Sequence, residues 1–288
     1  MVVLFSTPKP FRDHIRTIQY NAIRSWTKLG PETSVLLLGD EEGCREAAGN
    51  IGVNHVSRIA KNEYGTPLVS DLFAVARMHS RARYLCYINA DIVLTSSFIE
   101  AFHRIRRRYR SFLTVGRRWD IDQTEEIVFG AGWAEELFGR ARSTGRLHEA
   151  TGIDYFLFSR DVLVTIPPFA IGRTAWDNWL IYSARNDGVP VIDATRSIVA
   201  IHQNHDYSHL ARGEADAFKG PESVRNLELA GGYPHCFTIL DATRIMSDRV
   251  FLPPFRWKNL KRLATTWIIM HEKIFEIVHR VRRSLFTN

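Results

Sequence analysis

Cysteine is scarce in this chain. Three cysteines occur in 288 residues, at Cys44, Cys86 and Cys236, far apart and without CxxC spacing. Structural zinc sites and disulfide frameworks use more cysteines at closer or regular spacing, so the sequence argues against both. We therefore expect a reducing compartment and a cytoplasmic protein.

Long apolar segments and several common catalytic motifs are also missing. No window approaches 18 uninterrupted apolar residues, so no membrane-spanning helix is expected, and the apolar run at 2–5 is too short for a signal-peptide core. The sequence has no GxGxxG and no GxxxxGK motif, which leaves a dinucleotide fingerprint and a P-loop without support. It also lacks GxSxG, so covalent acyl chemistry has little support.

Positive charge is concentrated at the C-terminal end. Residues 251–288 contain eight lysines and arginines against two glutamates, which accounts for +6 of the net charge of +7. The second basic cluster, at 104–110, is interpreted as the solvated face of a helix. Because the rest of the chain is close to neutral, we expect no nucleic-acid partner.

The first ninety residues alternate between strand and helix patterns. Strands are predicted at 2–5, 34–38, around 53–59 and at 84–88, and helices at 13–28, 41–48 and 67–78. The strands are almost continuously apolar, which is typical of a parallel sheet covered by helices on both faces. After residue 111 the pattern becomes mixed, with short strands at 111–116, 155–159, 190–194 and 197–201 and a helix at 175–183. We predict an α/β fold with a mostly parallel central sheet.

Asn89-Ala90-Asp91 directly follows the buried strand at 84–88. A carboxylate in such a place is costly unless it is paired, solvated or bound to a cation. At the end of a strand, Asn89 and Asp91 can face a divalent cation and the phosphates that it carries, with Asp91 as the stronger ligand. A structural explanation stays open, in which the three residues form an Asx turn or cap the next helix.

A histidine cluster at 202–209 follows another strand. Its candidate metal ligands are His202, His205 and Asp206, and the alternative is a hydrogen-bonded surface turn. Parallel strands end at one edge of a sheet, so Asp91, Asp40 and the loop 6–11 are expected to converge on one crevice. One of the histidines would then complete an oxygen-rich metal site.

Asp177 lies between two tryptophans in the segment 172–184. Burial raises the pKa of such a carboxylate, which suits a general base near neutral pH, whereas the alternative is an Asp that braces the start of a helix. Asp154, just before the strand at 155–159, is a second candidate carboxylate. Trp176 and Trp119 are candidate stacking surfaces for a sugar.

Together these pieces, over about residues 1–210, resemble a GT-A-type nucleotide-sugar glycosyltransferase, similar to the bacterial family 2 enzymes. The resemblance implies a GT-A-like (Rossmann-like) domain over 1–250, with a nucleotide-binding half at about 1–110 and an acceptor-side half at about 111–210. Asn89 departs from the family's Asp-x-Asp motif, which leaves metal dependence open. The cofactors implied are Mn²⁺ or Mg²⁺ and a UDP- or GDP-linked sugar donor.

The resemblance also assigns roles to residues. The nucleotide contacts would be Ser6, Thr7, Pro8, Asp40, Arg58, Asp71, Asn89, Ala90 and Asp91. The metal ligands would be Asp91 and His202 or His205, Asp177 would be the general base of an inverting transfer, and the acceptor side would contain Arg118, Trp119, Asp154 and Trp176. The acceptor would be a glycan or a lipid-linked glycan in bacterial polysaccharide or glycolipid assembly.

Two other functions stay open at this point. One is a nucleotidyltransferase or a metal-dependent phosphohydrolase on a similar sheet, although the first loop, 6–11, offers only Lys9 to grip a triphosphate. The other is a carbohydrate- or membrane-binding module without turnover, which the Asn89 departure favours.

The segment 251–288 is predicted to be a basic amphipathic helical extension. Its apolar residues recur three or four apart at Leu260, Leu263, Trp267, Met270, Ile274, Ile277 and Val281. Three interpretations compete: a helix packed on its own domain, the seam of a homodimer, and a helix lying on an anionic membrane. The last would place the protein peripherally on the inner face of a membrane.

Overall fold

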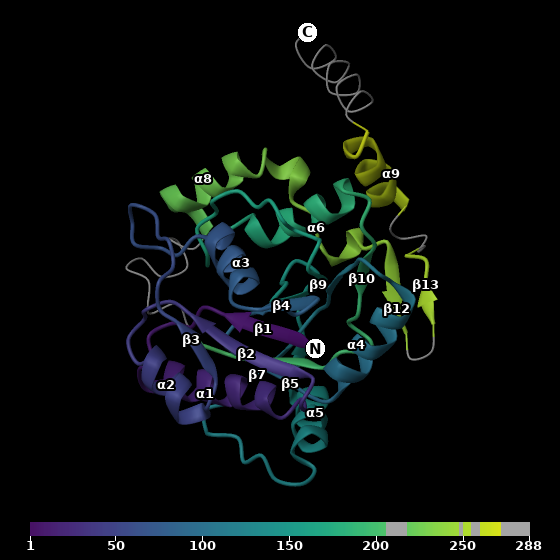
Figure 1. Cartoon of the computed structure of the whole chain (residues 1–288). Coiled ribbons are helices and arrows are strands. Elements are labelled where there is room, and N and C mark those ends of the chain that lie inside the picture. The colour runs from purple at the N-terminus through teal and green to yellow at the C-terminus, as the bar shows by residue number, and fades with distance from the viewer. Residues whose placement is uncertain (206–217, 248–249, 255–259, 272–288) are drawn as a thin grey trace.

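A nine-stranded sheet forms the centre of the molecule (Figure 1). The computed structural model describes residues 1–205, 218–247, 250–254 and 260–271. In spatial order the strands are β13 (Phe251–Leu252), β12 (Arg244–Met246), β10 (Val191–Asp193), β6 (Leu113–Val115), β9 (Tyr155–Ser159), β4 (Tyr84–Ile88), β1 (Val2–Ser6), β2 (Thr33–Leu38) and β3 (Asn54–Val56). Among these strands, only β9 and β13 run antiparallel to their neighbours. The predicted mostly parallel sheet is confirmed.

The described residues form eight α-helices, most of which cover the two faces of the large sheet. They are α1 (Asp13–Thr27), α2 (Cys44–Ile51), α3 (Val69–Met78), α4 (Ser97–Arg108), α5 (Trp133–Thr144), α6 (Trp176–Asn186), α8 (Pro221–Leu229) and α9 (Leu260–Ile269), with short 3₁₀ turns at Tyr233–His235 and Ile239–Asp241. Figure 1 shows α3, α6 and α8 on one side of the sheet and α1 and α2 on the other.

The alternation of side chains along β1 explains why two cores form. Val3 and Phe5 belong to the core under α3 and α6, whereas Val2 and Leu4 belong to the core under α1, α2 and α4. Successive residues of a strand point to opposite faces, so a strand covered on both faces must be apolar throughout. All five residues of β1 are buried.

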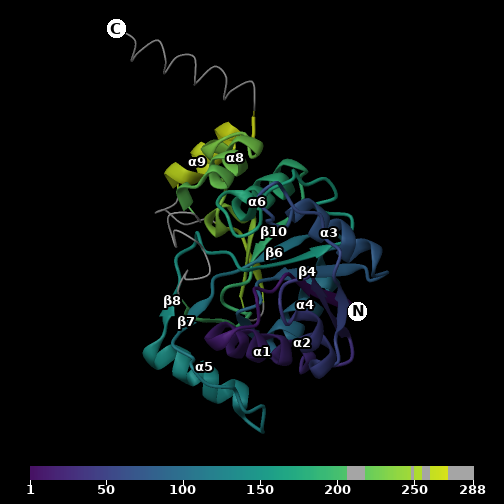
Figure 2. The same cartoon turned by 90° about the vertical axis from the view of Figure 1, so that its left-hand side faces the viewer.

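A second sheet, with four strands, adjoins the large sheet. Its order is β5 (Ile92–Leu94), β11 (Ala200–Gln203), β7 (Trp119–Ile121) and β8 (Arg146–Leu147). One of its faces packs on α5 through a small apolar core, and Figure 2 shows β7 and β8 beside that helix. The short segment 89–91 links β4 of the large sheet to β5 of the small one, so both sheets meet at this point.

The helix predicted at 41–48 begins later, at Cys44. Gly43 precedes it with φ of +79°, a left-handed conformation that glycine adopts without steric cost. A Cβ at Gly43 would lie 2.8 Å from the Phe11 Cβ, so the close approach of the loop 6–11 also requires glycine here. The acidic residues before Gly43 therefore belong to a turn.

Helix α9 packs against the domain. Its Arg262 and Thr266 donate hydrogen bonds to the buried carboxylate of Asp241 at 2.9 and 2.7 Å. Trp267 on the same helix is 53% exposed. Residues 272–288 of the predicted helix lie outside the described residues. In the part of the chain that the structure describes, every helix is too short or too polar to cross a membrane.

Candidate functional site

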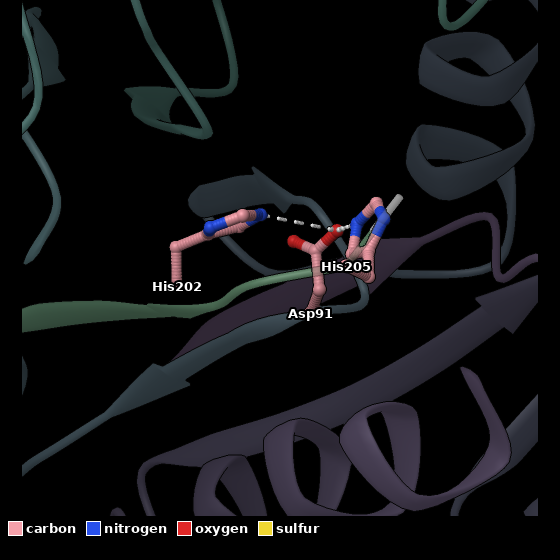
Figure 3. Close-up of side chains that lie close together, drawn as sticks. All are labelled: Asp91, His202 and His205. Carbon is pink, nitrogen blue, oxygen red and sulfur yellow. Dashed lines mark hydrogen bonds and ion pairs between the residues drawn. The ribbon is translucent and has the colours of Figure 1, made fainter. Parts of the chain in front are cut away.

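Asp91, His202 and His205 form a compact cluster at the end of β4 (Figure 3). Asp91 Oδ2 lies 3.0 Å from His205 Nε2 and 3.9 Å from His202 Nε2. One atom from each of the three side chains lies within 4.8 Å of the other two. The side chains are only 7–13% exposed, so the cluster is largely shielded from solvent.

Strand pairing explains why residues 111 positions apart come together. In the small sheet, β5 pairs with β11 so that His202 lies opposite Ile92, the residue after Asp91. The buried Gln203 then holds the Asp91 carbonyl, to which its backbone N–H and its Nε2 donate hydrogen bonds at 3.3 and 3.1 Å. The Asp91 backbone is thereby fixed between the two sheets. Asp206, the other predicted ligand, lies outside the described residues.

The cluster fits a divalent cation. Asp91 Oδ1 is buried and has no hydrogen-bond partner among the described residues, so an oxygen that needs a cation or a donor faces the cluster. A carboxylate and two imidazoles are common ligands of divalent transition metals when other positions stay open. These three residues could hold the ion, and the remaining positions would be available to water and phosphate oxygens.

Asp91 is held in its ionised form. Burial, the largest single effect, raises the pKa of this carboxyl, but the His205 hydrogen bond and the electrostatic interactions with His202 and Lys9 outweigh it, so the pKa lies far below its ordinary value. Lys9 Nζ lies 3.2 Å from His205 Nε2, and Gln19 fixes the backbone of Lys9 by accepting from its N–H and donating to its carbonyl. A cation on the loop after β1 therefore lies beside the candidate metal site.

Asn89 faces away from the cluster. Its Oδ1 accepts a hydrogen bond from the Tyr87 hydroxyl at 3.0 Å, and its Nδ2 donates to Asp154 Oδ1 at 2.8 Å. An aspartate at position 89 would have no proton to donate to Asp154 and would place two carboxylates together. The departure from Asp-x-Asp thus has a local explanation, because Asn89 connects β4 to the residue before β9.

Asp154 and Arg118 form a buried ion pair beside Asn89. Arg118 Nη1 lies 2.5 Å from Asp154 Oδ1, and the two side chains are 16% and 7% exposed. The second oxygen of Asp154 is buried without a hydrogen-bond partner among the described residues. Burial lowers the pKa of Arg118, but its contacts with Asp154 and Asp120 raise the pKa by more than burial lowers it. The guanidinium therefore stays charged.

Asp177 lies in the first turn of α6, and Ala175 before it has a strained φ of +76°. Burial raises the pKa of Asp177 to about 7, and the negative charge of Asp154 adds to this effect, whereas the Asn178 N–H, 2.9 Å from Oδ1, opposes it. Burial raises the pKa of the Tyr87 hydroxyl most, and the negative charges of Asp91, Asp154 and Asp177 add to the rise. Trp176, the residue before Asp177, packs on Tyr87 near the end of β4, which brings the start of α6 to the same end of the sheet as Asp91.

The end of β1 and the loop after it carry the predicted nucleotide contacts Ser6, Thr7 and Pro8. Ser6 and Pro8 are buried, and the hydroxyls of Ser6 and Thr7 have no hydrogen-bond partner among the described residues. Because Gly39 at the end of β2 approaches Thr7, an added Cβ there would lie 3.3 Å from the Thr7 Oγ1. Two buried hydroxyls without a partner among the described residues therefore lie at the carboxyl end of β1.

The other predicted nucleotide residues lie along the same edge. Asp40 is exposed and pairs with Lys61 at 2.6 Å, a contact that lowers the pKa of the Asp40 carboxyl. Asp71 accepts a hydrogen bond from the Ala60 N–H at 2.7 Å, so it braces the segment that carries Lys61. Arg58 is exposed, and the structure brings Lys61 rather than Arg58 to Asp40. Ala90 is buried between Asn89 and Asp91.

The two predicted stacking residues pack against protein. Trp176 is 5% exposed and lies 5.4 Å from the Tyr87 ring, and Trp119 packs edge-on to Phe138 at 6.2 Å. Trp176 is therefore part of the core beneath α6, and Trp119 joins β7 to α5.

Sequence analysis overlooked Lys61 and Asp120, and it considered Lys9 only for a nucleotidyltransferase. Asp120 contacts Arg118 and two histidines, His148 and His202. Its signal was present in the segment 117–120, where only Arg118 and Trp119 were singled out. The partners of Asp120 come from three separate strands or loops, so only the pairing of β7 with β11 and β8 identifies it.

Several solved structures are similar to this chain in fold. A mycobacterial protein matches over 82% of this chain and 74% of its own, with a TM-score of 0.50 and 16% identity. Glucosyl-3-phosphoglycerate synthase from Mycobacterium tuberculosis matches over 88% and 90%, with a TM-score of 0.49 and 15% identity. TarS of S. aureus, solved with UDP-GlcNAc, matches over 71% and 60%, with a TM-score of 0.46 and 10% identity.

The likeness at these identities concerns the fold alone. The expected α/β class, with a large central sheet between helices, is confirmed. No protein-family model and no curated protein matches the sequence.

Proposed function

We propose that this chain is a GT-A-type glycosyltransferase that moves a sugar from a nucleoside-diphosphate donor to a hydroxyl acceptor. The observation that supports this most is the Asp91, His202 and His205 cluster at the carboxyl end of β4, beside Lys9 and the loop after β1. In an open α/β sheet this is the edge at which ligands bind. Asp177, a carboxyl that titrates near neutral pH, lies at the same end.

The metal is proposed to be Mn²⁺ in preference to Mg²⁺. Mg²⁺ prefers an all-oxygen octahedral shell, whereas two imidazoles favour a transition-metal ion. When bound, the ion would neutralise charge on the diphosphate and so stabilise its departure. The ligands from this chain would be Asp91, His202 and His205.

The chain's own residues would bind the rest of the donor. Ser6 and Thr7 have buried hydroxyls without a partner among the described residues, and Lys9 would supply a positive charge near the departing phosphate. Asp40 at the end of β2, with Lys61, would contact the nucleoside of a UDP- or GDP-linked sugar. Arg58 and Asp71 are proposed to border this part of the site.

Asp177 is proposed as the general base of an inverting transfer. Its carboxylate would accept the proton of the acceptor hydroxyl while the hydroxyl oxygen forms a bond to the anomeric carbon. The bond from that carbon to the diphosphate oxygen breaks, and the electron pair leaves with the diphosphate. Asp154 and Arg118 would line the acceptor side, where the unpartnered Asp154 oxygen can accept a hydrogen bond from a sugar hydroxyl.

The acceptor is proposed to be a glycan or a lipid-linked glycan, as in bacterial polysaccharide or glycolipid assembly. The exposed Trp267 on α9 would then contact an anionic membrane surface. Flotation of the full chain with liposomes that contain phosphatidylglycerol tests this part. If the protein stays in the unbound fraction at low salt, the proposed membrane contact is excluded.

A thermal-shift panel tests the donor site. The full chain would be heated with UDP, GDP, CDP or TDP, each with Mn²⁺, Mg²⁺ or EDTA, and Asp91→Ala would be measured in parallel. Stabilisation grows with the logarithm of ligand concentration over Kd, by about 2.7 kcal/mol at a hundredfold excess. We expect one nucleotide to stabilise the wild type with Mn²⁺ and to lose this effect in Asp91→Ala. The absence of any nucleotide effect would contradict the proposal.

A further inference from the structure

We infer that Asp120 is a positioning residue that holds the His202 ring with its proton on Nδ1, so that the Nε2 lone pair points into the metal cluster. The inference rests on the proposed function, because it concerns the metal site of that transferase. It adds a residue to the site that takes no direct part in holding the ion.

Strand register places Asp120 directly beside His202. In the parallel pair of β11 and β7, His202 and Asp120 are Cα partners, and on the other side of β11 His202 is partnered with Ile92. One residue of β11 is therefore held between the Asp91 segment and Asp120. Because adjacent partners in a sheet share a face, the two side chains meet without any loop to position them.

The two nitrogens of His202 face two different carboxylates. Nε2 lies 3.9 Å from Asp91 Oδ2, and Nδ1 lies 3.3 Å from Asp120 Oδ1. Nδ1 is buried and forms no hydrogen bond to a described residue, so Asp120 Oδ1 lies within ion-pair distance of an otherwise unpartnered nitrogen. A neutral imidazole carries one proton, so the carboxylate at Nδ1 selects the tautomer that leaves Nε2 free as a ligand.

Asp120 is itself held from several directions. Arg118 Nε donates to Oδ1 at 2.9 Å, His148 Nδ1 lies 2.7 Å from Oδ2, and Arg146 lies 3.8 Å from the same oxygen. Only 11% of the Asp120 side chain is exposed. The carboxylate that orients the ring therefore cannot rotate freely.

A purely structural role for Asp120 would predict something different. An aspartate that only joined β7 to its neighbours would stabilise the small sheet without affecting the His202 tautomer. Metal-binding histidines commonly donate their second nitrogen to a carboxylate, and loss of that carboxylate typically lowers metal affinity 10–100-fold. The tautomer and the metal affinity are thus the measurements that separate the two roles.

The first experiment needs no metal. The full chain, labelled with ¹⁵N-histidine and kept metal-free at pH 8, would be measured by long-range ¹H–¹⁵N NMR, with His202→Gln to assign the resonance. We expect the wild type to carry the His202 proton on Nδ1 and Asp120→Asn to lose this preference. A wild-type ring with its proton on Nε2 would overturn the inference, whatever the metal does.

The second experiment measures Mn²⁺ affinity by calorimetry for the wild type, Asp120→Asn and the control Asp122→Asn. Asp122 lies two residues away, is exposed, and accepts a single hydrogen bond from Asn204. We expect a 10–100-fold weaker Kd for Asp120→Asn and less than a twofold change for the control. Equal affinities of wild type and Asp120→Asn would overturn the inference alone, whereas a wild type that binds no Mn²⁺ would overturn the proposed metal site as well.

Discussion

At the scale of single residues, Asp177 and Asp91 show how neighbouring groups set the pKa of a carboxyl. Its position at the start of α6 removes it from water and keeps it near Asp154, and both effects favour the protonated form. A carboxyl with a pKa of about 7 can release and accept a proton at physiological pH. Asp91 is also buried, but it lies beside His205, His202 and Lys9 and stays ionised, as its proposed role as a metal ligand requires.

Asp177→Asn should lower kcat of sugar transfer by about 10²–10⁴-fold, because the amide cannot accept the acceptor's proton. Nucleotide affinity should stay near the wild-type value, since Asp177 is not among the donor contacts. In the wild type, kcat/KM should fall below pH 7 as the base becomes protonated. Initial rates between pH 5 and 9 measure the loss of kcat and the pH dependence of kcat/KM. A variant with wild-type kcat would exclude Asp177 as the base.

The same carboxyl should make stability depend on pH. Its pKa is about 7 in the folded chain against an ordinary 3.8, so between these values the folded state binds more protons than the unfolded state. Stability from this group is therefore present at low pH and lost as pH rises through about 7. We expect Asp177→Asn to raise Tm relative to the wild type at pH 8 but hardly at pH 4. Calorimetry at both pH values measures this, and a constant difference would contradict it.

At the scale of elements, Gly116 and Gly49 differ in how much space their neighbours leave for a side chain. Gly116, between β6 and Arg117, has no room for a side chain, because an added Cβ would overlap the Tyr155 hydroxyl and lie 3.1 Å from the Thr195 amide nitrogen. Gly49, inside α2, has nothing within 4 Å of the corresponding position. Both are glycines, but only Gly116 is required by its neighbours.

Gly116→Ala should destabilise the protein by about 1–3 kcal/mol through overpacking. Gly49→Ala is the matched control and should stabilise it by about 0.5–1 kcal/mol, because alanine loses less conformational freedom in a helix. Urea unfolding gives both free energies. Two changes of the same sign would mean that the space around Gly116 differs from that described here.

At the scale of the whole molecule, the three thiols should be protected together. Burial raises the pKa of Cys44 to about 12 and that of Cys236 to about 11, and it raises the pKa of Cys86 further. Since the thiolate is the reactive form, the folded chain should react with DTNB at pH 8 on the order of a hundredfold more slowly than the unfolded chain. Stopped-flow absorbance measures the rates. A fast phase of one thiol in the folded chain would identify a cysteine that is more accessible than the structure shows.

Sequence reasoning succeeded where a property is local. The hydrophobic period of neighbouring residues predicted the apolar strands at 2–5, 34–38 and 84–88 and the helix at 13–28. The positions of Asp91 and Asp177 at element ends followed from the same patterns. The start of α2 was wrong by three residues, because it depends on how closely Phe11 approaches Gly43.

Sequence by itself determined the α/β class, the polar residues at the strand ends and the absence of a disulfide framework. Only tertiary structure decided which of those polar residues meet. Asn89 and Asp91 are two residues apart, yet one turns to Asp154 and the other to His205, a choice made by β9 and β11. Asp120 became visible for the same reason: strand pairing joins residues about eighty positions apart, and no local pattern records the register.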